Sequence, residues 1–271
     1  MLTAHNRTPL EGHCMFGLKK TLAALLFVIV PCFAQAGESE TPMTDPLVCT
    51  FSLVACDLES KQWGIVVASR YYSVGTVVPW ADADVGAVAT QSFVNISFGP
   101  RGLDLLRQGK TAEETIQLLL ADDPMRGGRQ IGVVDAQGNA ATYTGDKSYP
   151  WAGGKTGKHY ACQGNILTGP EVVDAMAKAY EETDGPFHWK LMKSLEAGDA
   201  AGGDSRGKQS ASILVVKDIS GPQGVNDRMI DLRVEDHADP VTELSRILSV
   251  RWPLIEEEPE PEPEPAPKET K

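Results

Sequence analysis

Cysteine and histidine are scarce in this sequence, and neither occurs in a pattern that binds a metal ion. The chain has five of each, with no Cys-x-x-Cys pair and no cluster of the two. We therefore expect no metal and no other cofactor. His159, His188 and His237 lie in unrelated contexts, without a carboxylate evidently placed to orient them. Because a Ser-His-Asp triad needs an oriented histidine, the sequence disfavours that class of hydrolase.

Basic residues are in short supply as well. Lysine and arginine total 25 against 37 aspartates and glutamates, which gives a formal net charge of −12. Loss of residues 1–36 would remove three basic residues and one acidic residue, leaving a net charge of −14. So acidic a protein is not attracted to polyanions. We therefore expect neither nucleic acid nor an anionic membrane surface as a partner.

The sequence lacks an apolar run long enough for a transmembrane helix, which takes about 20 residues. Its apolar run Thr21–Val30 follows Lys19-Lys20 and precedes the small-residue pattern Ala34-Gln35-Ala36. This order is typical of a secretory signal peptide, here residues 1–36. A lipoprotein anchored through Cys32 is the alternative, although Pro31 stands where such a site needs a small residue. We expect a periplasmic or secreted protein with no stable membrane insertion after cleavage.

The chain beyond residue 36 divides into three parts. Residues 37–49 are mostly polar and contain two prolines, which predicts a mobile leader. Residues 50–253 have the length of one globular domain. Residues 254–271 are rich in alternating Glu and Pro, which predicts a disordered acidic tail. Cys49, Cys56 and Cys162 remain, and an odd number of cysteines cannot all pair. We expect buried thiols, with at most one disulfide, between Cys162 and one of the other two.

The pattern of apolar residues predicts an α+β fold. Cys49–Gly75 has the pattern of two strands joined by a polar turn, and the second, Trp63–Ala68, is almost wholly apolar. Further strands are expected at Asp84–Thr90, Arg129–Asp135, Ala140–Thr144, His159–Cys162, Ser212–Val216 and Met229–Val234; helices at Gly99–Gln108, Thr111–Ala121, Pro170–Glu182, Phe187–Ala197 with Gly198 as C-cap, and from Pro240. Strands in hairpins and helices in pairs argue against βαβ units. Two mostly antiparallel sheets, each covered by helices, fit this order best.

A glycine-rich loop, Gly202–Lys208, has the spacing of a phosphate-binding P-loop but not its context. The motif needs Ser or Thr next, where this chain has Gln209, and a strand before it rather than a helix. Nucleotide binding is therefore rejected. Asp204, Arg206 and Gln209 remain candidate ligand-binding residues, since polar loops entering a core strand often carry sites. As single residues they are equally well explained as solvated charges of a connector.

Thr50 is the candidate nucleophile. A threonine made N-terminal can use its own α-amine, with an unperturbed pKa of roughly 7.7–8.0, as the base for its hydroxyl. Such a site needs no histidine. Arg70, at the end of the second strand, is the expected cation that keeps this amine neutral. The alternative is that Thr50 is an ordinary β-branched strand residue.

Seven blocks in order suggest a family. They are TFSLVACD from Thr50, GIVVASR from Gly64, VGAVATQ from Val85, RQIGVVDAQG from Arg129, TYTG from Thr142, QGNIL from Gln163 and GGDSRGKQSAS from Gly202. Together they resemble domain-of-unknown-function family 1028, which is N-terminal-nucleophile (Ntn) hydrolase-like. The resemblance implies a four-layer αββα sandwich of the kind found in proteasome β-subunits, and it supplies no substrate.

The chain departs from that family in one respect, because members usually begin at the threonine. Here Thr50 follows 13 residues of leader after the expected signal cleavage. Either a second cleavage between Cys49 and Thr50 frees the amine, or Thr50 never becomes a nucleophile. The chain could catalyse that cleavage itself. The sequence therefore supports two hypotheses: an exported Ntn-type amide hydrolase, or an inactive cell-envelope binding protein on the same fold. Either would take a small molecule or short peptide and could form a homo-oligomer; the residues expected to line its site are Gln91, Arg129, Asn165, Asp204, Arg206 and Gln209.

Overall fold

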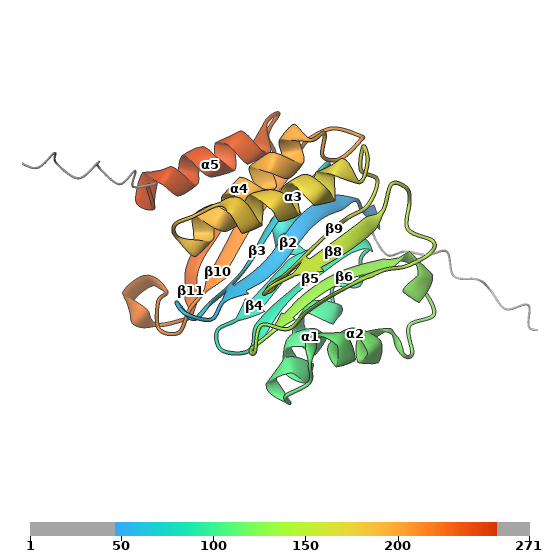
Figure 1. The fold of residues 1–271 in the computed structure, drawn as a ribbon, viewed down its shortest axis with the longest axis horizontal. Coiled ribbons are helices and arrows are strands. Elements are labelled where there is room, and N and C mark those ends of the chain that lie inside the picture. The colour runs from blue at the N-terminus through green and yellow to red at the C-terminus, as the bar shows by residue number, and fades with distance from the viewer. Residues whose placement is uncertain (1–46, 254–271) are drawn as a thin grey trace, which may run out of the picture. The chain divides into compact units, whose positions relative to one another are not determined.

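Two antiparallel sheets lie face to face in the computed structural model, which describes residues 47–253 (Figure 1). The first sheet has six strands in the order β11–β10–β3–β2–β9–β8. Their bounds are β2 Thr50–Asp57, β3 Gln62–Ser69, β8 Gly153–Gly157, β9 Tyr160–Gly164, β10 Ser210–Val216 and β11 Arg228–Val234. The expected signal peptide, most of the leader and the acidic tail lie outside the described residues.

The second sheet has five strands, with β5 and β6 at its centre. Their bounds are β1 Leu47–Val48, β4 Pro79–Asp82, β5 Gly86–Phe93, β6 Arg129–Asp135 and β7 Ala140–Thr144. β6 pairs with one edge of β5, and β1 and β4 pair with successive parts of the other edge. Every strand pair in both sheets is antiparallel.

Helices cover the outer face of each sheet, as Figure 1 shows. The five-stranded sheet carries α1 (Phe98–Arg107) and α2 (Ala112–Leu120), and the six-stranded sheet carries α3 (Glu171–Glu182), α4 (Phe187–Ala200) and α5 (Pro240–Arg251). Short 3-10 turns lie at η1 (Val74–Thr76), η2 (Arg126–Gly128) and η3 (Pro222–Gly224). The order of layers is αββα, which confirms the fold class expected from the sequence.

The face of β2 that points between the sheets is apolar toward the end of the strand and polar toward its start. Phe51, Leu53 and Ala55 belong to the apolar cluster beneath α3, α4 and α5, whereas Val54 and Cys56 belong to the apolar cluster between the sheets. This alternation is the two-residue period of a strand. Toward the start of β2 the inward position is polar, because the hydroxyl of Ser52 donates to Oε1 of Gln91 in the facing sheet at 2.7 Å. The space between the sheets is therefore apolar at one end and polar at the end where Thr50 lies.

The structure corrects the sequence-based expectations in two places. The leader does not run free to Cys49: Leu47 and Val48 form β1, and Val48 and Cys49 are fully buried. Gly198 is not a C-cap, because α4 continues to Ala200. A Cβ on Gly198 would approach Cγ of Met176 to 2.7 Å, so the glycine allows α3 and α4 to pack closely.

Two strands escaped the sequence pattern for physical reasons. β8 has the sequence GGKTG and is mostly exposed, so it has neither apolar alternation nor β-branched content beyond one threonine. β4 begins with Pro79, and proline is tolerated as the first residue of an edge strand. Cys49, Cys56 and Cys162 are free and buried, as expected. Within residues 47–253 no helix is both long enough and apolar enough to cross a bilayer.

Candidate functional site

Thr50 is the first residue of β2 and has no solvent exposure. Its hydroxyl Oγ1 donates to the carbonyl oxygen of Val48 at 2.9 Å and lies 3.3 Å from Oγ of Ser69. Ser69 is the residue opposite Thr50 at the end of β3. The antiparallel hairpin β2–β3 thus brings two hydroxyl groups together at the polar end of the inter-sheet space.

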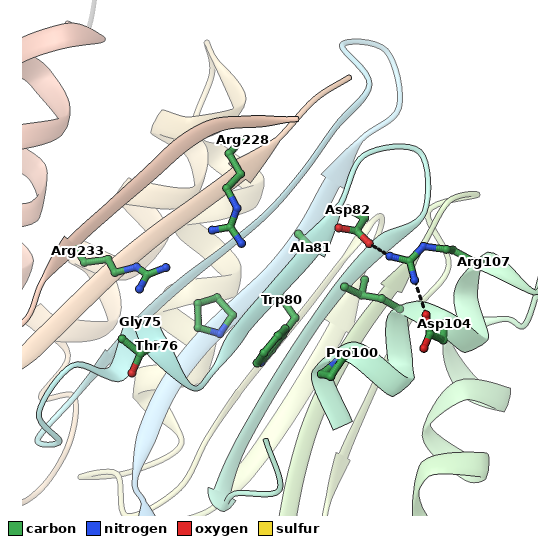
Figure 2. Close-up of a pocket in the computed structure, with 12 residues that line it drawn as sticks. Gly75, Thr76, Trp80, Ala81, Asp82, Pro100, Asp104, Arg107, Arg228 and Arg233 are labelled. Carbon is green, nitrogen blue, oxygen red and sulfur yellow. Dashed lines mark hydrogen bonds and ion pairs between the residues drawn. The ribbon is translucent and has the colours of Figure 1, made fainter. Parts of the chain in front are cut away.

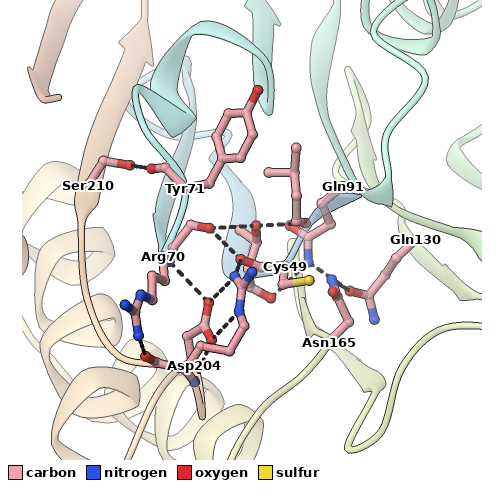
Figure 3. A network of polar contacts seen from close by, with 12 residues as sticks. Cys49, Arg70, Tyr71, Gln91, Gln130, Asn165, Asp204 and Ser210 are labelled. Atoms are coloured by element: carbon pink, nitrogen blue, oxygen red, sulfur yellow. Dashed lines mark hydrogen bonds and ion pairs between the residues drawn. The ribbon is translucent and has the colours of Figure 1, made fainter. Parts of the chain in front are cut away.

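The carbonyl group of Cys49, which forms the peptide bond to Thr50, accepts two hydrogen bonds. Oγ of Ser69 donates to this oxygen through a short contact, and Nη2 of Arg206 donates to it at 3.2 Å. Figure 3 shows this oxygen near the centre of a polar network, with Asp204 on one side and Gln91 and Asn165 on the other. A hydroxyl and a guanidinium on one carbonyl oxygen are an arrangement that stabilises negative charge there.

The thiol of Cys49 does not take part in that chemistry. Burial raises the pKa of Cys49 to about 11, although the nearby Arg206 guanidinium acts in the opposite direction. A thiol with such a pKa is protonated at neutral pH and is a poor nucleophile.

Asp204 fixes the position of Arg206. Its carboxylate accepts from Nη2 of Arg206 at 2.6 Å and from the backbone N–H and Nε of Arg206 at 3.0 Å each. It also accepts from the backbone N–H of Arg70 at 3.0 Å. The Asp204 side chain is almost fully buried, whereas the Arg206 side chain is one-third exposed. The hydrogen bond from Arg206 to this carboxylate raises the arginine's pKa, so the guanidinium on the Cys49 carbonyl is firmly charged.

Arg70 and Gln209 point elsewhere. The guanidinium of Arg70 is exposed and donates to the carbonyl oxygen of Arg206. The amide of Gln209 donates to Oδ1 of Asp236 at 3.1 Å. The cation that contacts the Cys49–Thr50 peptide is therefore Arg206, and the role of Arg70 as the tuning cation stays a prediction.

A second part of the network consists of buried amide side chains between the sheets. Nε2 of Gln91 and Nδ2 of Asn165 both donate to Oε1 of Gln130, at 2.8 and 2.9 Å. The backbone N–H of Asn165 donates to the carbonyl oxygen of Thr50 at 3.0 Å, and Nε2 of Gln91 approaches the same oxygen to 3.4 Å. Gln163 donates to Oγ of Ser52 at 2.8 Å. Gln91 and Asn165 were expected near the site from the sequence; Gln130 and Gln163 were not.

Arg129 lies apart from this network. Its Nε donates to Oδ2 of Asp123 at 2.6 Å, its Nη1 donates to the carbonyl oxygen of Phe93, and both charged side chains are buried. Burial of Asp123 opposes its ionisation, but the hydrogen bonds from Arg129 and from the backbone of Met125 prevail and lower the pKa of Asp123. Arg129 is thus a structural residue beneath α1, not a neighbour of Thr50.

The loop that carries Arg206 also has the Gly-x-Ser-x-Gly spacing of a nucleophile elbow, at Gly203–Gly207. That motif requires a strand before the serine and a helix after it. Here α4 precedes the loop and β10 follows it, and Ser205 is exposed. The loop therefore lacks the elbow geometry. Among residues 47–253 no group of three or more His, Cys, Asp and Glu side chains is arranged to hold a metal ion.

Two cavities bear on what the site can bind. A small one of about 70 Å³ is bordered by Ser69, Asp204 and Phe51. It has room for only one or two water-sized groups, since a water molecule occupies about 30 Å³ of liquid. The cavity borders Ser69 and Asp204 of the network, but Thr50 is not among the residues that line it.

The other cavity is a groove of about 420 Å³ between β11 and α1, with Trp80 on its floor (Figure 2). Its arginines are all engaged by carboxylates. Arg107 pairs with Asp82 and Asp104, and Arg228 and Arg233 share Asp231. The groove therefore presents no excess positive charge for an anion, and its place at the sheet edge separates it from the Thr50 network.

The chain has an αββα fold, with Thr50 as the first residue of β2 in the six-stranded sheet. It belongs to a family of unknown function, DUF1028, whose model matches residues 50–244. The match begins at Thr50, so Leu47–Cys49 precede it.

A solved structure of the same family agrees with this assignment. The crystal structure of protein SPO2555 from Silicibacter pomeroyi, which carries the same family model, is 29% identical with a TM-score of 0.68. That similarity covers 74% of this chain and 85% of the other. Anbu (ancestral beta-subunit) from Yersinia bercovieri is 10% identical with a TM-score of 0.34, over 76% of this chain and 99% of the other. No curated protein matches the chain.

Proposed function

We propose that this protein is an exported Ntn-type hydrolase that cleaves an amide bond in a small molecule or short peptide. In this proposal Thr50 becomes the nucleophile after the Cys49–Thr50 bond is cut. The observation that carries it is the pair of donors, Ser69 and Arg206, on the carbonyl oxygen of that one bond, beside a buried Thr50 hydroxyl.

The chain's own residues can cut this bond. Oγ of Thr50 attacks the carbonyl carbon of Cys49, and the oxyanion that forms is stabilised by Ser69 and Arg206. The C–N bond then breaks, and the Thr50 nitrogen keeps its own hydrogen and takes up the proton lost by the hydroxyl. The product is an ester between Cys49 and Oγ of Thr50. Water hydrolyses this ester, which leaves a carboxylic acid on Cys49 and a free amine and hydroxyl on Thr50.

The cleaved chain then acts on an external amide by the same chemistry. The free α-amine of Thr50 takes the proton from its hydroxyl, and its ordinary pKa near 8 suits a general base at neutral pH. Arg206 beside it favours the neutral form of the amine by charge repulsion. Gln91 and Asn165, which hold the Thr50 carbonyl, keep the nucleophile in position.

The second candidate is a cell-envelope binding protein that never frees Thr50. It is favoured by the internal position of Thr50 and by the complete burial of this residue. The two functions differ in the covalent state of the chain, which makes them easy to separate.

The test is the intact mass and N-terminal sequence of full-length protein recovered from the cell envelope or medium of a bacterial host. We expect a chain that begins at Thr50, and we expect Thr50→Ala to stay uncleaved while Thr50→Ser is cleaved more slowly. Ser69→Ala and Arg206→Gln should each slow cleavage by about 10²–10³-fold, as loss of one oxyanion donor does in other enzymes. Ser212→Ala, which removes another buried strand hydroxyl, is the matched control and should be cleaved normally.

Activity is then measured on a panel of peptide and acyl amides. Amide hydrolysis by a chain that still begins at Gly37, or by Thr50→Ala, would exclude the Ntn mechanism. A stable uncleaved chain that binds a ligand without turnover would establish the second candidate.

A further inference from the structure

The two residues before Cys49 occupy the edge of β5 as a short strand. Leu47 lies opposite Phe93 and Val48 opposite Ser92 in antiparallel register. The paired strand β4 covers the same edge only over Gly86–Ala89. The part of the edge next to the Thr50 site is thus occupied by the chain's own leader, and it lies outside the stretch that the family model matches.

The leader is held by burial as well as by pairing. Val48 is fully buried in the apolar cluster between the sheets, which also contains Val74, Val78 and Val94. Cys49 is fully buried too. Burial of the valine side chain stabilises the docked leader, because it removes apolar surface from water. A charged side chain in the same position would be strongly disfavoured.

The leader is also on the acyl side of the bond that Thr50 faces. Leu47, Val48 and Cys49 end in the carbonyl that Ser69 and Arg206 bind. If this bond is cut as described above, the ester on Thr50 carries the acyl group of a peptide ending in Leu-Val-Cys. An external peptide amide with a similar sequence would form the same kind of ester on the same oxygen.

We propose that the space filled by Leu47–Cys49 is the enzyme's acyl-side substrate site, and that the substrate is an extended peptide with a small uncharged residue at the cleaved bond and an aliphatic residue before it. This inference rests on the proposed function for the cleavage step. The peptide pairs with β5 at Ser92–Phe93 as an added strand. Its second residue from the cleaved bond enters the Val48 position, between the sheets.

The site extends beyond Leu47. A cavity of about 80 Å³ borders Phe93, the partner of Leu47 in β5, and is walled by Met125 and Lys147. It offers room for one further side chain of the peptide beside the end of β5. Leu47–Cys49 therefore mark only the inner part of the proposed site.

The test measures binding of acetyl-Leu-Val-Ala-amide by calorimetry, with acetyl-Leu-Asp-Ala-amide as the matched control. Two forms of the protein have the leader out of the site: the self-cleaved chain after dialysis to remove its leader peptide, and the full-length Val48→Asp variant, because an aspartate is strongly disfavoured in the apolar cluster that Val48 occupies. We expect both to bind the valine peptide at least about tenfold more tightly than the aspartate peptide, since only the former fills an apolar position. The uncleaved wild-type chain should bind neither peptide, because its own leader fills the site.

The outcomes separate this inference from the proposed function. Selective binding by Val48→Asp, with no hydrolysis of any amide by the wild-type protein, supports the site and refutes the hydrolase. Hydrolysis of other amides, with no selective binding of the valine peptide to the cleaved chain, refutes the site and leaves the hydrolase standing. Equal affinity for the two peptides in both proteins also overturns the inference.

Discussion

Replacing Asp204 with asparagine tests whether the loop after α4 is organised by one carboxylate. That carboxylate accepts from three nitrogens of Arg206 and from the backbone of Arg70, and its side chain is 1% exposed. Asparagine keeps one acceptor oxygen and puts an N–H₂ donor where Arg206 also donates. The variant therefore loses charge-assisted bonds and places two donors face to face.

The expected loss in free energy of unfolding is about 2–4 kcal/mol. Removing one partner of a buried pair costs about 3–5 kcal/mol, and we take a lower figure because Arg206 is one-third exposed and can turn to water. For a domain of this size the loss lowers the melting temperature by roughly 5–15 °C. Self-cleavage should slow by at least about tenfold, since Arg206 is no longer held on the Cys49 carbonyl.

Urea unfolding followed by circular dichroism gives the stability, and intact mass over time gives the cleavage rate. The matched control is Lys208→Gln in the same loop. Lys208 is 43% exposed and pairs with Asp199 and Asp239, so its loss should cost less than about 1 kcal/mol. An Asp204→Asn protein as stable as wild type, with unchanged cleavage, would refute the role given to this carboxylate.

Three further predictions concern the frame around the site. Gln130→Leu should lower the free energy of unfolding by about 2–4 kcal/mol, measured by urea unfolding. The reason is that the buried amide groups of Gln91 and Asn165 lose the oxygen to which they donate. Arg129→Met should lower the free energy of unfolding by about 3–5 kcal/mol at pH 7, because it leaves the buried Asp123 carboxylate without its cation. The fold lowers the pKa of Asp123, so the wild-type protein should be the more stable above the unfolded pKa of about 4. This difference in stability should vanish as the pH falls below that value, which urea unfolding at a series of acidic pH values measures. Gly198→Val should lower stability by about 1–3 kcal/mol through overpacking against α3, while a valine variant as stable as wild type in thermal unfolding would show that the helices can separate without cost.

Much of the fold is legible in the sequence because local patterns and final elements agree. Thr111 and Glu114 form a capping box at the start of α2, where the sequence predicts a helix from Thr111. The expected bounds of β6 and β7 match the structure. β1 and β8 could not be predicted this way. β1 is held by pairing with β5, which is distant in sequence, and β8 is itself mostly glycine, so neither strand has a local pattern of apolar residues.

The candidate site was only half visible. Arg129 and Gln130 are neighbours in β6, so they face opposite sides, and the inward one is Gln130. The apolar neighbours Ile131 and Val133 lie on the helix side, a two-residue pattern that would have assigned Arg129 correctly. Ser69 was harder to find, because its role depends on register: it matters only since β3 places it opposite Thr50.

The contrast between the two ends of the inter-sheet space also determines where the two sheets can separate most easily. At one end the sheets touch through Val54, Ile65 and their apolar neighbours, and parting them would expose hydrocarbon to water. At the other end they touch through amides and hydroxyls, which water can satisfy nearly as well as their present partners. We therefore expect the sheets to stay together at the apolar end and to separate first at the polar end. We expect opening motions of the sandwich to concentrate at the polar end, where Thr50 lies.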